Sequence, residues 1–272
     1  MKSAKNWVLL LVGMALTLSA CASSPQGRIY VGIQNPYFVL KPGLLKDYRA
    51  AYGGQPKLVG WPVEWGHPFP TDEVLGYIEN QAVTVIEWHL PTPENGFSDP
   101  LSMLKAGDWD SDLRDWADGL KKVRYPVMIW LSAPELGWSR SEYEAAFTYI
   151  ANYFKRGAVS NVLWVMETNI TPSLSELPDH WVLVNIASLA EIPEPTFQSH
   201  YPVLLRVRNL HKRDAGQTQK ELVRKLNNPQ SKIRAIVFQD QNSSVSVPPD
   251  GLATLLKDAV FDANLDDIQE VE

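Results

Sequence analysis

The stretch Pro126-Val-Met-Ile-Trp-Leu-Ser-Ala133 decides the fold, because an amphipathic segment and a second apolar run follow it. Its apolar residues continue without polar alternation, as in a parallel strand that is buried on both faces. The segment Ser141–Arg156 opens with a Ser-x-x-Glu pattern formed by Ser141 and Glu144, which predicts a capped helix. The second apolar run, Asn161–Asn169, completes a predicted strand–helix–strand unit.

The same alternation extends outward from this unit along the chain. Eight strand-like runs are expected, at Ile29–Gln34, Lys57–Trp65, Ala82–Leu90, Pro126–Ala133, Asn161–Asn169, Trp181–Ser188, Pro202–Asn209 and Ile233–Gln239. Further helical patterns occupy Lys41–Tyr52, Asp72–Asn80 after a Thr71 N-cap, Asp110–Val123, Gln217–Leu226 and Leu252–Phe261. This order predicts an α/β protein, a single-domain (β/α)8 TIM barrel. An open doubly wound sheet is the alternative, although no glycine-rich nucleotide motif follows any strand.

The N-terminal residues have the pattern of an export signal. Lys2 and Lys5 precede an apolar stretch that is too short to span a bilayer, and Leu18-Ser-Ala-Cys21 resembles a bacterial lipobox. The resemblance implies cleavage before Cys21 and acylation of that residue, including palmitate, so that the membrane is a partner through a lipid anchor. An ordinary signal peptide with a chance cysteine is the alternative.

These patterns divide the chain into four parts. Residues 1–20 are the expected signal peptide, 21–27 the lipidated cysteine and a short tether, 28–263 the barrel, and 264–272 an acidic tail. Removal of 20 residues from 272 leaves 252, close to the roughly 250 typical of such a barrel. Ala22 follows Cys21 where an aspartate would indicate inner-membrane retention, so we expect the outer membrane rather than the inner one.

Composition restricts the partners. The formal net charge is −6, and loss of Lys2 and Lys5 makes it −8, which argues against a nucleic-acid partner. The histidines show no metal-ligand spacing, and Cys21 is the only cysteine, so neither a metal nor another cofactor is expected.

Carboxylates and tryptophans gather where the predicted strands end, which is where TIM barrels carry their function. Glycosidic chemistry uses two carboxyl groups, and aromatic faces stack on sugar rings. Glu135 is therefore a candidate acid and Glu167 a candidate partner carboxylate. Candidate substrate-binding residues are Glu64, Trp65, Glu87, Trp88, Trp138, Asn169, Arg206, Arg208 and Asp240. The alternative is structural, because such acids also cap helices or pair with arginine, and tryptophans also pack cores.

Several segments resemble glycoside hydrolase family 26, the β-mannanases. They include Arg28-Ile-Tyr-Val-Gly32, Val85-Ile-Glu-Trp88 through Pro91, and Phe154-Lys-Arg-Gly-Ala158. The resemblance implies a (β/α)8 barrel that acts as a retaining hydrolase on polysaccharide. It also implies an acid in an Arg-x-x-His-Glu motif ending strand four and a nucleophilic glutamate ending strand seven.

The sequence departs from the family at both positions. The strand-four motif falls on Trp130-Leu-Ser-Ala-Pro134, and the nucleophile position falls on Arg206. A guanidinium has no lone pair with which to attack an anomeric carbon. We therefore expect polysaccharide or oligosaccharide binding without the family's reaction. The alternative is an active glycosidase with a relocated pair, in which Glu135 acts with Glu167, Glu87 or Asp240.

A third interpretation concerns the basic residues that end strand seven, which are Arg206, Arg208, His211, Lys212 and Arg213. They could hold an anionic sugar, such as a uronate or a phosphorylated glycan. The structural alternative is that Arg206 pairs with a glutamate at the rim of the barrel and that the other side chains are solvated.

Overall fold

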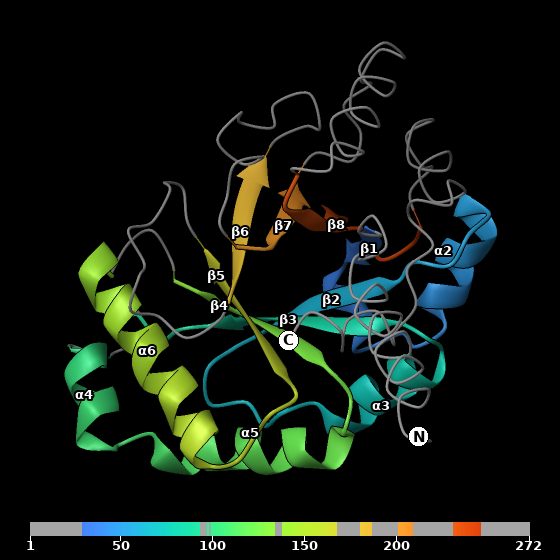
Figure 1. Cartoon of the computed structure of the whole chain (residues 1–272). Helices are drawn as coiled ribbons and strands as arrows, with labels where there is room; N and C mark the ends of the chain where they lie inside the picture. Colours follow the sequence, from blue (N-terminus) through green and yellow to red (C-terminus); the bar gives the residue numbers. More distant parts are fainter. Residues whose placement is uncertain are drawn as a thin grey trace, which may run out of the picture.

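Eight parallel strands close into a barrel in the order of the sequence (Figure 1). The computed structural model describes residues 29–92, 97, 99–133, 138–167, 180–186, 201–208 and 231–245. The strands are β1 (Tyr30–Gln34), β2 (Leu58–Val63), β3 (Val83–His89), β4 (Val127–Ser132), β5 (Val162–Glu167), β6 (Trp181–Ile186), β7 (Val203–Val207) and β8 (Ile233–Gln239). Every predicted strand is present, and pairing of β1 with β8 excludes the open sheet.

Helices lie outside the strands wherever the connections are described (Figure 1). They are η1 (Pro36–Phe38), α2 (Leu44–Tyr52), α3 (Thr71–Glu79), α4 (Pro100–Ala106), α5 (Asp110–Val123) and α6 (Arg140–Arg156). The predicted helices Gln217–Leu226 and Leu252–Phe261 lie outside the described residues, as do residues 1–28 and the acidic tail. No helix among the described residues is long and apolar enough to cross a membrane.

Two predicted helix N-caps are wrong. Thr71 is the first residue of α3 rather than its cap, and no side chain caps that helix because Pro70 precedes it. The capping box of α6 is formed by Ser139 and Glu142. Two overlapping Ser-x-x-Glu patterns occur here, and Glu144 of the second pairs with Arg140 at 2.8 Å instead.

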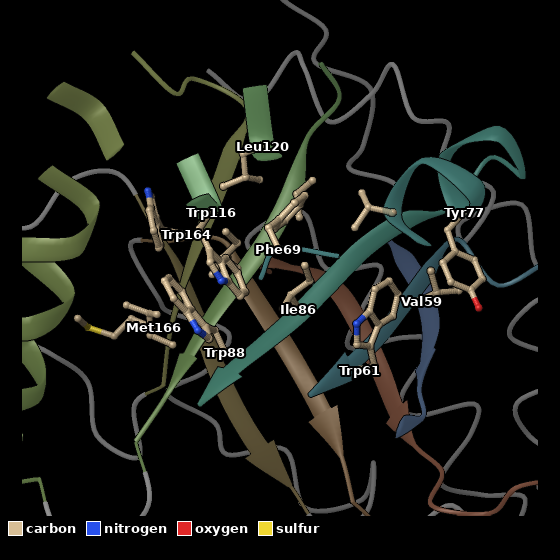
Figure 2. Close-up of a cluster of buried hydrophobic side chains, with 14 of the residues drawn as sticks. Val59, Trp61, Phe69, Tyr77, Ile86, Trp88, Trp116, Leu120, Trp164 and Met166 are labelled. Atoms are coloured by element: carbon tan, nitrogen blue, oxygen red, sulfur yellow. The ribbon is translucent and has the colours of Figure 1, made fainter. Parts of the chain in front are cut away.

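Two apolar clusters hold the barrel together. Side chains at alternate strand positions point to opposite sides, so one set fills the interior and the other packs against the helices. The interior cluster includes Val83 and Val85 of β3, whereas Ile86 and Trp88 of the same strand belong to the outer cluster. Figure 2 shows part of this outer cluster, with Trp88 and Trp116 side by side.

Candidate functional site

Four polar side chains form one layer inside the barrel near the carboxyl ends of the strands. Because the strands are tilted, residues at one height shift by two positions between a strand and the next but one. Glu87 pairs with Trp130, and Trp130 pairs with Val165, but the β5 residue level with Glu87 is Glu167, two residues further on. This offset places one residue from each odd-numbered strand at the same height. In the polar layer these residues are Gln34 (β1), Glu87 (β3), Glu167 (β5) and Arg206 (β7). Branched apolar residues usually fill such positions, so the polar composition is unusual.

The even-numbered strands contribute the layers on either side. Below the polar layer lie Gly60, Trp130, Leu183 and Val237, and above it lie Pro62, Ser132, Asn185 and Gln239. A Cβ atom at Gly60 would lie only 2.8 Å from the backbone oxygen of Val85. The glycine therefore allows β2 to lie close against β3 below the polar layer.

Glu87 is the centre of the polar layer. Its side chain is 9% exposed, and its Oε2 accepts hydrogen bonds from Nη2 of Arg206 at 3.3 Å and from Nε2 of Gln34. Its Oε1 lies 3.4 Å from Nε2 of His89. Burial opposes ionisation, but the His89 hydrogen bond, the Arg206 and His89 charges and the Gln34 hydrogen bond together lower the pKa of Glu87. Glu87 is therefore a carboxylate with both oxygens occupied.

His89 joins the buried layer to the rim. Its Nε2 faces Glu87, and its Nδ1 lies 2.8 Å from Oε1 of Glu64, whose side chain is 59% exposed. Burial disfavours the imidazolium, yet the contacts with Glu87 and Glu64 outweigh it and raise the pKa of His89. Because both ring nitrogens face carboxylate oxygens, the arrangement favours the doubly protonated ring.

Arg206 occupies the position predicted for the family's nucleophile, and it pairs with Glu87 across the barrel. The centre of its guanidinium lies 4.4 Å from the centroid of the Trp130 ring in the layer below. Burial is the largest influence on the pKa of Arg206 and lowers it. The structural alternative for Arg206 is thus confirmed, because it pairs with a glutamate near the end of a strand. The sequence resemblance aligns Trp130 with the arginine of the family's strand-four motif. In this structure the guanidinium of Arg206 lies over that tryptophan ring.

Glu167 is in a different environment from Glu87, although both belong to the same layer. Its carboxylate accepts a hydrogen bond from Nδ2 of Asn185, and its backbone N–H donates to the Tyr143 hydroxyl at 3.0 Å. Burial raises the pKa of Glu167, while Arg206 and Asn185 oppose that shift only in part. The layer therefore holds two glutamates whose pKa values are shifted in opposite directions, lowered for Glu87 and raised for Glu167.

One of the three tryptophan predictions differs from the structure. Trp88 is fully buried between Trp65 and Trp116, with ring centroids 4.6 Å and 3.7 Å away, so neither face is open and the prediction that it stacks on a sugar is wrong. Trp65 is half-buried and stacks one face on Trp88, so it belongs mainly to this aromatic packing. Trp138 is half-buried, and its Nε1 donates to the Pro91 carbonyl at 2.8 Å.

Asp240 is also misassigned as a direct sugar contact. It is only 2% exposed, and its carboxylate accepts hydrogen bonds from the Tyr48 hydroxyl at 2.7 Å and from Asn242. Tyr48 lies on α2, so Asp240 connects the end of β8 to the helix that follows β1. Its role is to hold the start and the end of the described barrel together.

Several predicted residues fall outside the part of the chain that the structure describes. They are Glu135, Asn169, Cys21 and the basic residues His211, Lys212 and Arg213. Arg208 is described and exposed, two residues nearer the rim than Arg206. Within the described ranges no group of three or more histidine, cysteine or acidic side chains could hold a metal ion.

The structure adds three residues that the sequence interpretation did not select. Gln34, His89 and Asn185 each contact a glutamate of the polar layer. Strand periodicity was the available signal, because Glu87 and His89 are two residues apart and must share a face. Trp88 lies between them and must face the other way.

Solved structures with the same architecture include several mannanases. A Bacillus subtilis mannanase is 15% identical, with a TM-score of 0.62 over 86% of this chain and 86% of that chain. The family 26 domain of an endo-β-mannanase/endo-β-glucanase from Prevotella bryantii is 10% identical, with a TM-score of 0.60 over 89% of this chain and 92% of the other. A family 26 protein from a Muricauda species is 14% identical, with a TM-score of 0.58 over 90% and 85% of the two chains.

The chain has the barrel fold of the family 26 glycoside hydrolases. The expected (β/α)8 architecture and the resemblance to the family 26 fold are thus confirmed. No protein-family model and no curated protein sequence matches the chain. At these identities the similarity establishes the fold, so the activity has to be argued from the site itself.

Proposed function

We propose that this protein binds a polysaccharide or oligosaccharide at the carboxyl end of the barrel and does not perform retaining hydrolysis. The observation that carries the proposal is the Arg206–Glu87 pair, with Nη2 3.3 Å from Oε2. A retaining reaction needs a carboxylate that can attack the anomeric carbon and a carboxylic acid about 5 to 5.5 Å from it. At the position that the sequence resemblance assigns to the family's nucleophile, β7 carries the guanidinium of Arg206.

Glu87 does not replace the missing nucleophile. One of its oxygens accepts from Arg206 and Gln34, and the other faces His89. Attack on a sugar would require one oxygen to leave these charged and hydrogen-bonding partners. Charge-assisted hydrogen bonds of this kind are roughly twice as strong as neutral ones. The ion pair with Arg206 therefore favours a structural role for Glu87 over attack on a sugar.

Binding is supported by the chemistry of the strand ends. Amide, carboxyl, imidazole and guanidinium groups can all hydrogen-bond to sugar hydroxyls, and the structurally similar proteins are mannanases. Buried polar atoms without partners in the described structure include Oε1 of Gln34, Oδ1 of Asn185 and Nε of Arg206. A sugar hydroxyl, directly or through a bridging water, can form the missing hydrogen bonds. This favours binding because a buried polar atom without a hydrogen bond destabilises the protein.

The test is calorimetric binding of manno-, gluco- and xylo-oligosaccharides to the purified protein, together with an assay of reducing ends. We expect binding to at least one of these neutral oligosaccharides or to an acidic one, and no release of reducing ends. Arg206→Met should abolish the binding, whereas Glu79→Gln on the exposed side of α3 should not change it. Release of reducing ends by the unaltered protein would contradict the proposal.

Hydrolysis by a relocated pair is the second candidate, and one observation favours it. Environments that push the pKa values of two carboxyl groups apart are typical of an acid and its partner, and Glu167 and Glu87 show opposite shifts. The sequence interpretation gave Glu135 as the acid and Glu167 as its partner, and the raised pKa of Glu167 makes it a candidate for the acid as well. Sugar release that is lost in Glu167→Gln or Glu135→Gln would support it. Inertness on a broad panel of glycans would exclude it.

The attachment of the protein rests on the sequence alone. We propose that Cys21 is acylated after signal cleavage and that the protein is anchored in the cell envelope, in the outer membrane rather than the inner one. Metabolic labelling with a palmitate analogue in a bacterial host should mark the protein and should not mark Cys21→Ser. Membrane fractionation then reports the compartment. Labelling that persists in Cys21→Ser would exclude this residue as the anchor.

A further inference from the structure

Two arginines of β7 and its end point the same way but have different surroundings. Arg206 and Arg208 are two residues apart and so share the interior face of the strand. The side chain of Arg206 is 9% exposed and is held by Glu87 and by the Trp130 ring. Arg208 is exposed, and no side chain in the described part of the chain forms a hydrogen bond or an ion pair with its guanidinium.

The acids nearest to these arginines already have partners. Glu64 faces His89, Glu87 faces Arg206 and His89, and Glu167 accepts from the Asn185 amide. Burial raises the pKa of Glu167, and the charge of Arg208 lowers that pKa by less. None of these acids forms an ion pair with Arg208, so its guanidinium has no directly bound carboxylate among the described residues.

A second observation points to a ligand rather than to a solvated surface arginine. Nε of the nine-tenths buried Arg206, directly below Arg208 on the same face, has no hydrogen-bond partner in the described structure. The Oε1 atom of Gln34, in the same layer, is also buried without a partner. Desolvated donors and acceptors that lack partners are rare in proteins, and they are expected where a bound group supplies the missing contacts.

We propose that the glycan bound at this end of the barrel is acidic and that Arg208 binds the carboxylate of a hexuronate unit. The inference rests on the proposed glycan binding and names its substrate class. The planar fork of a guanidinium matches a carboxylate in bidentate geometry, which a neutral hydroxymethyl group cannot do. Arg208 is the one exposed arginine at the described end of β7, so it can bind one carboxylate of such a glycan.

The test uses two probes that differ only at C6. A β-1,4-linked mannuronate hexamer carries carboxylates where mannohexaose carries hydroxymethyl groups. Isothermal titration of both into the purified protein should show about tenfold tighter binding of the acidic probe. The preference should shrink at high salt, because screening weakens an exposed ion pair.

Variants distinguish binding at Arg208 from a general effect of the protein's charge. Arg208→Gln should lower the affinity for the mannuronate hexamer to that for mannohexaose, and Arg208→Lys should retain only part of the preference because it lacks the planar fork. Arg114→Gln, on the exposed face of α5, removes the same charge elsewhere and should leave the preference intact.

The outcomes are distinguishable. Equal affinity for the two probes, or equal losses in Arg208→Gln and Arg114→Gln, would overturn the acidic-glycan site while leaving glycan binding in place. Failure to bind either probe would overturn the inference, and failure on the neutral panel as well would overturn the proposed function.

Discussion

Replacement of Arg206 by methionine tests the buried pair by a stability measurement. The substitution keeps an unbranched apolar stem above Trp130 but removes the group that lies 3.3 Å from Glu87. Breaking a buried ion pair by removing one partner typically costs about 3–5 kcal/mol. Glu87 keeps its contacts with Gln34 and His89, so we expect the smaller loss of about 2–3 kcal/mol in the free energy of unfolding.

The loss should depend on pH in a defined direction. The pKa of Glu87 is lowered in the folded protein, so its contribution to stability is present above its unfolded pKa of about 4.3 and is lost as pH falls through the folded value. Removal of Arg206 raises that folded pKa toward the unfolded one. The difference in stability between Arg206→Met and the unaltered protein should therefore be largest near neutral pH and should shrink in acid.

Urea denaturation followed by tryptophan fluorescence measures both effects, and a double-mutant cycle isolates the pair. Glu87→Gln and the Arg206→Met/Glu87→Gln double variant complete the cycle, which should give a coupling energy of about 1–3 kcal/mol. Arg114→Met on the exposed face of α5 is the control and should cost less than about 0.5 kcal/mol. A cost below about 0.5 kcal/mol for Arg206→Met as well, with no pH dependence, would refute the reasoning.

Three further predictions concern neighbouring groups. His89 has a raised pKa, so its contribution to stability should be complete below the unfolded value of about 6.5 and lost as pH rises through the folded value; His89→Gln should flatten this dependence in urea titrations, and an NMR titration of the ring that gives an ordinary pKa would contradict it. Glu167→Gln should stabilise the protein at neutral pH by about 0.5 kcal/mol, because burial penalises the ionised carboxyl and the amide oxygen still accepts from Asn185; a marked loss in thermal unfolding would show that the carboxylate itself is needed. Trp88→Ala should cost about 3–5 kcal/mol in guanidinium unfolding, since it opens a cavity between Trp65 and Trp116; a loss below about 1 kcal/mol would mean that the stack contributes little.

The strands of this protein follow directly from its sequence. Runs such as Pro126–Ala133 can only be buried strands or buried helices, and their length and β-branched neighbours favour strands. The structure gives β4 as Val127–Ser132, one residue shorter at each end. The repeated alternation predicted a parallel sheet covered on both faces, and the pairing of β1 with β8 in the structure decides for a closed barrel over an open sheet.

The site was less predictable because it depends on which face of a strand each residue occupies. Glu87 and Trp88 are adjacent in the sequence and end on opposite sides of the barrel wall. The two-residue periodicity of a strand predicts that Glu87 and Trp88 point to opposite faces. It does not predict which distant residue contacts Glu87. Arg206 is 119 residues away and is brought near by the register and closure of the sheet.

The helix caps show a different limit. Ser139 and Ser141 both begin Ser-x-x-Glu patterns, and the sequence does not say which serine has the extended backbone that a cap requires. In the structure Ser139 has the extended backbone, and its side chain accepts from the Glu142 backbone N–H. Such a choice depends on how the chain enters the helix from β4.

The central claim is that the arginine of β7 makes this barrel able to hold a glycan but not to cut it by the retaining route. The most direct measurement is reducing-end release by the purified protein during prolonged incubation with whichever oligosaccharide it binds in calorimetry. We predict saturable binding and no release above a control without protein. Release that rises with protein concentration and disappears in Glu87→Gln or Glu167→Gln would contradict the claim.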